Sequence, residues 1–272
     1  MVLCNTSIYG IIGSDIGYSL SPMVYRELFA LKQIAAIYNI FDLPDSDLKD
    51  FVKSARLLRL SGFNVTIPHK RAIVPLLDRL DWIAEQTGAT NLVINRKGSL
   101  IGYNTDYEGL RQSIEVRLKC VVKGARVAVL GSGGSAQTVY YYLASRGARS
   151  ISVYHRSGAS LLHFGKFVRR LQKQFGYQAA LMDNLIDDLG DCDLCINCTP
   201  APITELVEAA TIKKVKRIFE LRYGDYPLLK RAHLRGNYML AVQAARNFKI
   251  MTGQEVTVNR VMRIIDGTRA HD

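Results

Sequence analysis

Apolar residues along this chain follow two patterns: short continuous runs that predict buried strands, and three-to-four spacings that predict amphipathic helices. Within the first 105 residues, strands are predicted over 8–13, 38–43 and 62–67, with a hairpin over 91–95 and 99–103. Helices are predicted from Ser21-Pro22, where an N-cap precedes a proline, and over 45–57 and 71–80. The alternation is typical of an α/β domain.

From residue 107 onward the alternation is more regular. We interpret a helix over 107–119 as the connector between two domains. The strands predicted after it cover 126–130, 151–154, a segment near 179, 194–197 and 217–221, and the helices 135–146 and 161–175. Two helices, over 243–250 and 255–265, end the chain. This order predicts a parallel sheet with right-handed crossovers.

A glycine-rich loop follows the first strand of this second block. Gly131-x-Gly133-x-x-Ala136 matches the dinucleotide-binding fingerprint, in which one glycine permits a tight turn and the next lets backbone approach a pyrophosphate. A strand precedes the loop and a helix follows it, as that motif requires. We therefore predict a dinucleotide site made by Gly131, Ser132, Gly133, Gly134, Ser135 and Ala136.

The second strand of the block bears on the choice of cofactor. An NAD site needs an acidic residue there for the ribose 2′-hydroxyl, but His155-Arg156-Ser157 ends this strand and the nearest downstream acid is Asp183. A guanidinium and a hydroxyl suit a 2′-phosphate. The sequence therefore favours NADP, although Arg156 as an ordinary exposed charge remains an open alternative.

Two polar clusters at strand ends supply groups for chemistry. In Asn64-Val65-Thr66-Ile67-Pro68-His69-Lys70 a strand stops at a proline and a lysine follows, and Asn104-Thr105-Asp106 comes 34 residues after that lysine. An amine can exchange a proton with an alcohol or a carbonyl while a nicotinamide moves a hydride, and a carboxylate can orient the amine. The alternatives are a surface lysine that opens a helix and an aspartate N-cap.

Composition limits the remaining classes. At 272 residues, 48% hydrophobic and 22% charged, the chain can fill real cores and is not disordered. No apolar run approaches the roughly 20 residues of a membrane span. The first basic residue is Arg26, so the N-terminus does not resemble a signal peptide, and thiols without a secretion signal predict a cytoplasmic protein.

Three of the five cysteines, Cys192, Cys195 and Cys198, have a spacing that invites a metal interpretation. The segment between them is a predicted buried strand, in which Cys195 would point away from the other two and act as a small apolar residue. No fourth ligand lies nearby in sequence, so we expect no metal.

The net charge of +12 allows nucleic acid as a partner, but the lysines and arginines are scattered. The densest group, over 213–217, precedes a predicted strand and is interpreted as a solvated face. An anionic cofactor and an acidic substrate would account for part of the excess positive charge. We therefore expect neither a nucleic-acid nor a membrane partner, and the sequence leaves monomer and homodimer open.

Taken together, these segments resemble the shikimate dehydrogenase family over nearly the whole chain. The resemblance implies an α/β fold of two domains with a cleft between them: a three-layer substrate domain over 1–105, completed by 239–272, and an NADP-binding Rossmann domain over 106–238. It implies reversible reduction of 3-dehydroshikimate to shikimate, a step of chorismate and aromatic amino-acid biosynthesis. The segments that carry it are Ser19 to Pro22, Asn64 to Lys70, Gly88 to Asn91, Asn104 to Asp106, the Gly131 loop, Asn197 to Thr199 and Met239 to Ala245.

The resemblance also implies roles for individual residues. Lys70 would transfer the proton, and Asp106 would orient the Lys70 side chain. Ser19 and Ser21 would hold the substrate carboxylate. Further substrate contacts are expected from Thr66, Asn91, Tyr223 and Gln243. Beside the glycine loop, the cofactor would be held by His155, Arg156, Ser157, Thr199, Tyr238 and Met239.

The departures from the family pattern concentrate where the resemblance places the nicotinamide. Prolines replace a glycine-bearing loop in Asn197-Cys198-Thr199-Pro200-Ala201-Pro202, and Tyr238 stands where the family has a glycine. Leu92 replaces a threonine, and Ser160 stands where a second phosphate-binding arginine is expected. These changes predict a divergent member with slow turnover of shikimate and little of quinate. The alternatives are a dehydrogenase of a related cyclic acid (quinate or an aminoshikimate) and a catalytically weak NADP-binding sensor.

Overall fold

The structure, a computed structural model, describes residues 6–155, 160–183, 189, 192–223 and 233–267. The chain forms two compact units. Unit 1 comprises Met1–Asp106 and Leu240–Asp272, and unit 2 comprises Tyr107–Met239. Asp106 thus belongs to unit 1 and Met239 to unit 2, one residue away from each predicted domain boundary.

Unit 1 is built on a six-stranded mixed sheet in the order β2-β1-β3-β5-β6-β4. Three strands run parallel: β1 (Ser7–Gly13), β2 (Ala36–Asp42) and β3 (Gly62–Val65). The predicted hairpin is confirmed as the antiparallel pair β5 (Leu92–Arg96) and β6 (Ser99–Tyr103). The short β4 (Arg79–Leu80) pairs with β6 at the edge.

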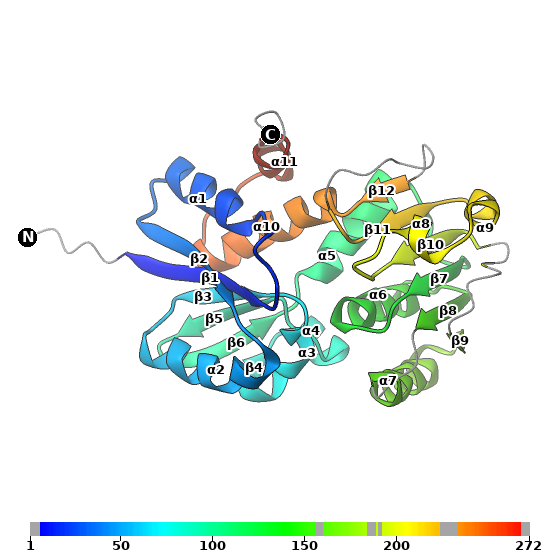
Figure 1. The fold of residues 1–272 in the computed structure, drawn as a ribbon, viewed down its shortest axis with the longest axis horizontal. Coiled ribbons are helices and arrows are strands. Elements are labelled where there is room, and N and C mark those ends of the chain that lie inside the picture. The colour runs from blue at the N-terminus through cyan, green and yellow to red at the C-terminus, as the bar shows by residue number, and fades with distance from the viewer. Residues whose placement is uncertain (1–5, 156–159, 184–188, 190–191, 224–232, 268–272) are drawn as a thin grey trace, which may run out of the picture. The chain divides into compact units, whose positions relative to one another are not determined.

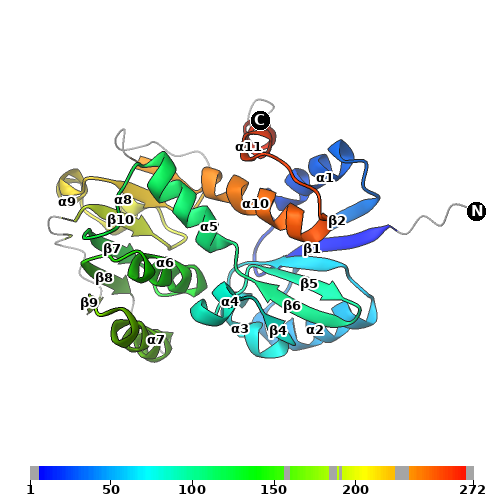
Figure 2. The same cartoon turned by 180° about the vertical axis from the view of Figure 1, so that it is seen from behind.

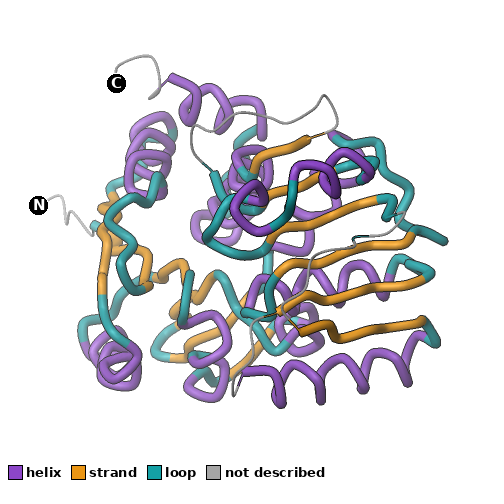
Figure 3. Tube along the Cα trace, turned by 45° about the vertical axis from the view of Figure 1, so that its right-hand side comes forward, coloured by secondary structure: helices purple, strands orange, loops and turns teal. Residues whose placement is uncertain are grey.

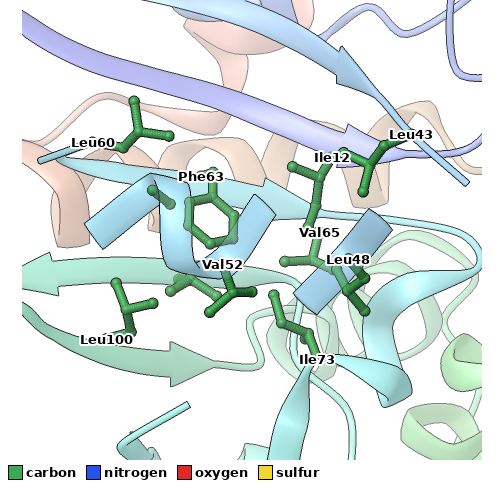
Figure 4. Packing of buried hydrophobic residues seen from close by; sticks show 11 residues of the cluster. Ile12, Leu43, Leu48, Val52, Leu60, Phe63, Val65, Ile73 and Leu100 are labelled. Carbon is green, nitrogen blue, oxygen red and sulfur yellow. The ribbon is translucent and has the colours of Figure 1, made fainter. Parts of the chain in front are cut away.

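Helices cover both faces of this sheet, as Figures 1 and 2 show for α2 on one face and α1 and α10 on the other. Figure 4 shows the α2 face: Leu48 and Val52 of α2 point at Phe63 and Val65 of β3, and Phe63 is fully buried. The helical elements of unit 1 are α1 (Ser21–Leu31), η1 (Asp45–Asp47), α2 (Leu48–Leu57), α3 (His69–Ala72), η2 (Val74–Leu76), α4 (Trp82–Thr87), α10 (Asn237–Thr252, from Leu240 on) and α11 (Val258–Gly267).

The opposite face of the sheet is aromatic and polar. Because side chains alternate along a strand, Tyr9 of β1 faces away from α2 and stacks on Phe29 of α1 at 5.4 Å. Phe29 also contacts Phe248 of α10. Tyr38 of β2 stacks on Tyr25 of α1 with 4.4 Å between ring centroids. The tyrosine side chains bring hydroxyl groups into this layer between the sheet and α1. The side chain of Asn64, from β3, also points into the layer.

Unit 2 holds a six-stranded, wholly parallel sheet whose strands run side by side in Figure 3. The order β9-β8-β7-β10-β11-β12 places the first strand of this unit at the centre, with later strands added on each side. This is the doubly wound dinucleotide-binding order, and it confirms the predicted α/β class with a parallel-sheet Rossmann unit. The strands are β7 (Arg126–Leu130), β8 (Ser150–His155), β9 (Gln178–Asp183), β10 (Leu194–Asn197), β11 (Ile218–Glu220) and β12 (His233–Arg235).

The helices of unit 2 begin with α5 (Asp106–Arg111), whose first residue belongs to unit 1, and a π-helical continuation, η3 (Gln112–Arg117). They continue as α6 (Gly134–Ser145), α7 (Ser160–Phe175), α8 (Ile203–Leu206) and α9 (Ala209–Lys214). None of the helices in the described part of the chain has the length and apolarity that a bilayer crossing needs.

Several predicted boundaries were wrong. The segment 71–80 is α3, η2 and β4 rather than one helix, because Pro75 and the short pairing of β4 interrupt it. The N-cap of α1 is Leu20, without a side-chain hydrogen bond, so Ser21 is the first helical residue and not the cap. Helix α4 was missed, although Asp81 caps its start and Gly88, at φ 61°, ends it.

We expect Phe63→Ala to destabilise unit 1 by about 3–5 kcal/mol, because it leaves a cavity between β3 and α2. Urea unfolding followed by circular dichroism would measure this. Leu58→Ala, at a side chain that is 66% exposed, serves as the control and should change stability by less than about 0.5 kcal/mol. Equal effects of the two substitutions would contradict the assigned core.

Candidate active site

Lys70 and Asp106 form an ion pair at one end of the unit 1 sheet. Lys70 lies in α3, directly after β3, and Asp106 follows β6 at the start of α5. Lys70 Nζ donates to Asp106 Oδ2 at 2.6 Å, and the side chains are only 13% and 2% exposed. A pair that is this buried requires further hydrogen bonds to compensate for lost hydration.

The backbone around Lys70 is fixed on both sides. His69 is fully buried, and its Nε2 donates to the carbonyl of Leu43 at 2.9 Å. The carbonyl of Lys70 itself accepts from the amide of Thr90 at 2.9 Å. Lys70 can therefore move its amine through side-chain rotation while its backbone stays in place.

Asn91 supplies the second hydrogen bond to the carboxylate. Its Nδ2 donates to Asp106 Oδ1 at 2.9 Å, so each oxygen of Asp106 has a separate donor. The amide of Thr105 donates to Asn91 Oδ1 at 2.8 Å, which fixes which way the Asn91 side-chain amide faces. Asn104 stabilises the turn that precedes Asp106, since its Nδ2 donates to the carbonyl of Ala89 at 2.9 Å.

A buried polar layer lies beneath Asn91. Asn64 Nδ2 donates to the carbonyl of Asn91 at 3.1 Å, and Asn64 Oδ1 accepts from the Tyr38 hydroxyl at 2.7 Å. Burial raises the pKa of Tyr25 well above its ordinary value, against hydrogen bonds with Asn247 and Asn64 that lower it. Tyr25 therefore keeps its hydroxyl proton in this layer at neutral pH.

The predicted carboxylate-binding serines lie in the loop from β1 to α1. Ser19 Oγ accepts from the amide of Ser21 at 3.3 Å, and Ser21 is buried at the start of α1. This loop approaches the Thr66 loop, because the amide of Ser14 donates to the carbonyl of Ile67 at 3.0 Å. A side chain at Gly13 would meet Thr66 Cγ2 at 2.7 Å, so glycine permits the approach. The loop that carries Ser19 and Ser21 thus starts beside the Thr66 segment, at the carboxyl ends of β1 and β3.

Gln243 joins the site from α10, and its Oε1 lies 3.1 Å from Asn91 Nδ2. Sequence reasoning assigned Asn91 and Gln243 to the substrate but gave no role to Asn247, one helical turn later. Asn247 Oδ1 accepts from the Thr105 hydroxyl at 2.6 Å. No sequence signal marks Asn247, because a lone asparagine on a helix is common. Tyr223, another predicted substrate residue, is half-buried in unit 2, and its role stays a prediction.

In unit 2 the glycine loop has the geometry that a dinucleotide requires. Gly131 has φ 102°, a conformation that favours glycine, and a Cβ there would lie 3.1 Å from Thr199 Cγ2. A Cβ at Gly133 would meet nothing within 4 Å, which leaves room above the first turn of α6. Ala136 is fully buried against the sheet, while Ser132, Gly134 and Ser135 are half-buried. These residues fit a pyrophosphate on the helix N-terminus.

The proline-bearing loop after β10 is held by two buried polar residues. Asn197 Oδ1 accepts from the amide of Thr199 at 3.0 Å, and its Nδ2 donates to the carbonyl of Ala201 at 2.7 Å. Glu220 of β11 is fully buried, and its Oε1 accepts from the amide of Ile203 at 2.6 Å. Thr199 lies next to Gly131, and its contact with the cofactor stays a prediction.

Tyr238 and Met239, predicted at the nicotinamide, contact the first helix of unit 2. The Tyr238 hydroxyl donates to Gln112 Oε1 at 3.4 Å, and the Arg117 guanidinium lies over its ring, 4.7 Å from the centroid. Met239 packs on Gly109, where a Cβ would lie 2.8 Å from Met239 Cγ. The Tyr238 ring thus has partners on η3, and its expected narrowing of a nicotinamide pocket stays a prediction.

The predicted 2′-phosphate residues are largely beyond the described part of the chain. Arg156 and Ser157 lie outside the described residues, and for His155 only its backbone, at the end of β8, is described. Among the residues that the structure does describe, no three histidine, cysteine or acidic side chains group together as metal ligands would. Cys192 and Cys195 are buried and Cys198 is half-buried.

A doubly wound dinucleotide-binding sheet in one unit and a buried lysine–carboxylate pair in the other define a nicotinamide-dependent dehydrogenase. The substrate-binding domain of shikimate dehydrogenase, as a family model, matches residues 11–93. A shikimate dehydrogenase (NADP⁺) of Geobacillus sp. strain WCH70 is 32% identical over 271 residues, covering 95% of this chain and 97% of the relative. The chain belongs to the shikimate dehydrogenase family.

Solved structures agree with this assignment. A crystal structure of a shikimate dehydrogenase in complex with NADP⁺ is 32% identical and has a TM-score of 0.84, covering 98% of this chain and 97% of its own. The shikimate 5-dehydrogenase of Listeria monocytogenes, in complex with shikimate and NAD, is 27% identical with a TM-score of 0.80, covering 96% of each chain.

Gly131→Ala should raise the dissociation constant for NADPH roughly tenfold, because an L-residue at this φ is strained. Titration of NADPH fluorescence would measure the change, and circular dichroism would report whether unit 2 stays folded. Gly176→Ala is the matched control, since Gly176 also has positive φ (68°) but no neighbour within 4 Å. Wild-type affinity in Gly131→Ala would remove this loop from the cofactor site.

Proposed function

We propose that this protein catalyses the NADP-dependent interconversion of shikimate and 3-dehydroshikimate, a step towards chorismate and the aromatic amino acids. The observation that carries the proposal is the buried Lys70–Asp106 pair with Asn91 as the second donor to the carboxylate. Relatives named shikimate dehydrogenase (NADP⁺) that match over nearly the full length support the same assignment.

Lys70 carries out the proton transfer in this proposal. When bound, NADP⁺ supplies the hydride acceptor for the carbon that bears the reacting hydroxyl. In the oxidation Lys70 Nζ starts as the neutral amine and takes up the hydroxyl proton; in the reduction it starts as the ammonium and gives the proton to the carbonyl oxygen. Asp106 holds the amine in the required direction through the 2.6 Å contact and accepts from a neighbouring ring hydroxyl.

The polar groups around this pair suit a polyhydroxylated cyclic acid. Ser19 and Ser21 offer hydroxyl groups to the carboxylate, while Thr66, Asn91 and Gln243 offer partners for ring hydroxyls. A site built from such groups discriminates strongly against analogues that lack one hydroxyl, because a buried partner would then stay unpaired. The proposed substrate is shikimate, in agreement with the names of the relatives.

A sensor that binds NADP without turnover is the second candidate, favoured by Tyr238 and the proline loop. The intact Lys70–Asp106 pair argues against it, because binding alone needs no proton-transfer group. The cysteines within the described residues do not form disulfides, which fits the reducing cytoplasm that we propose as the protein's compartment. Both a monomer and a homodimer are compatible with the activity, and sedimentation would distinguish them.

Lys70→Met should lower kcat for shikimate oxidation by about 10²–10⁴-fold, because methionine keeps the length of the side chain but transfers no proton. NADPH absorbance would report the rate, and the dissociation constant for NADPH should stay within twofold. Lys249→Met, at an exposed lysine of α10, is the control and should retain wild-type kcat. A Lys70→Met enzyme at full rate would refute the proposed proton transfer, and quinate turnover above that of shikimate would refute the substrate.

Arg156→Ala should raise KM for NADP⁺ by about tenfold or more and leave KM for NAD⁺ nearly unchanged, because a guanidinium binds the 2′-phosphate that only NADP⁺ carries. Steady-state kinetics with both cofactors would measure the two values. Arg149→Ala, at an exposed arginine before β8, controls for lost positive charge. An equal rise in KM for NADP⁺ and NAD⁺ would exclude a role of Arg156 in the choice between the two cofactors.

A further inference from the structure

The Thr105 hydroxyl has three possible partners but only one proton. Asn247 Oδ1 lies 2.6 Å away, Asn91 Nδ2 2.9 Å and Asn91 Oδ1 3.2 Å. The shortest contact joins two oxygens, of which only the hydroxyl can donate, so Thr105 donates to Asn247. The Thr105 oxygen then accepts from Asn91 Nδ2.

Asn91 Nδ2 also has more partners than protons: it carries two protons, and three acceptors lie within hydrogen-bond distance. Asp106 Oδ1 and Thr105 Oγ1 lie at 2.9 Å and Gln243 Oε1 at 3.1 Å. One acceptor must stay unpaired with this amide. As long as Thr105 accepts one proton and Asp106 the other, the unpaired acceptor is Gln243, which has the longest contact.

Asn247 is well placed to control this choice. It is 2% exposed, lies on α10 one turn after Gln243, and also interacts with the Tyr25 hydroxyl. Tyr25 is itself stacked on Tyr38 and fully enclosed, so the acceptor of Asn247 is held in one direction.

We infer that Asn247 is a positioning residue: by accepting the Thr105 hydroxyl proton it commits Asn91 to Thr105 and Asp106, and so leaves Gln243 Oε1 for a hydroxyl of the substrate. This rests on the proposed function, in which Gln243 binds the substrate. Without Asn247 as acceptor, the Thr105 proton turns to Asn91 Oδ1, and Asn91 Nδ2 pairs with Gln243 instead.

Kinetics of Asn247→Leu test the inference, since leucine keeps the approximate shape and removes the acceptor. We expect KM for shikimate to rise about three- to tenfold, the usual worth of one hydrogen bond, while kcat and the NADPH dissociation constant stay within twofold. Thr105→Val should give a similar rise in KM, and Thr105→Ser, which keeps the hydroxyl, should behave as wild type.

Two mutant cycles separate this role from a merely structural one. In a Thr105→Val background and in a Gln243→Ala background, Asn247→Leu should add less than twofold to KM. In each cycle the two substitutions disturb the same contact between Gln243 and the substrate, so their effects should not add. Val52→Ala, a core variant of unit 1, controls for lost stability and should leave KM unchanged. If Asn247→Leu does not fold, Thr105→Val and its combination with Gln243→Ala make the same comparison.

Additive effects in either cycle, or wild-type KM in both Asn247→Leu and Thr105→Val, would overturn the inference. A fall in kcat alone would also overturn it, because Asn247 would then act through Asp106 and not through Gln243. Wild-type enzyme without any shikimate turnover would instead refute the proposed function, so the two failures are distinguishable.

Discussion

The site in unit 1 depends on one constraint, the need to satisfy a carboxylate that is almost completely buried. Asp106 is 2% exposed in its side chain and has a separate donor for each oxygen, Lys70 for one and Asn91 for the other. Removing either donor would leave a buried charge under-compensated, which costs far more than an ordinary hydrogen bond contributes. The same requirement that stabilises the carboxylate therefore fixes the amine for proton transfer.

The surrounding fold can be read as support for those two donors. Lys70 is fixed through its backbone by Thr90 and through the buried His69, so only its side chain is free to follow a proton. Asn91 is fixed by Thr105 and Asn64, and the layer of tyrosines between the sheet and α1 completes the hydrogen bonds below it. The side chains of Asn64 and Asn91 are tolerated at this depth because they have partners of complementary type.

The sequence was sufficient for the fold class and for the residues that carry motifs. Continuous apolar runs located β7 and the hairpin of β5 and β6 well, because burial on both faces or a tight turn leaves a clear signal. It failed at 71–80, where Pro75 and a two-residue edge strand override helical spacing, and at α4, which is too short to show periodicity. Lys70 and Asp106 stood out because their segments have unusual polar composition. Asn247 could not, since its role exists only through contacts with Thr105 and Tyr25, distant in sequence.

The discontinuity of unit 1 has a consequence for synthesis of the protein on the ribosome. Thr105 and Asn247 are 142 positions apart, and all of unit 2 is translated between them. Domains generally fold as they emerge, so unit 2 can fold while the sheet of unit 1 still lacks α10 and exposes Tyr9 and Phe29. A nascent chain is therefore vulnerable to aggregation and to chaperone capture over that interval, and catalytic competence arrives only with the last stretch to be translated.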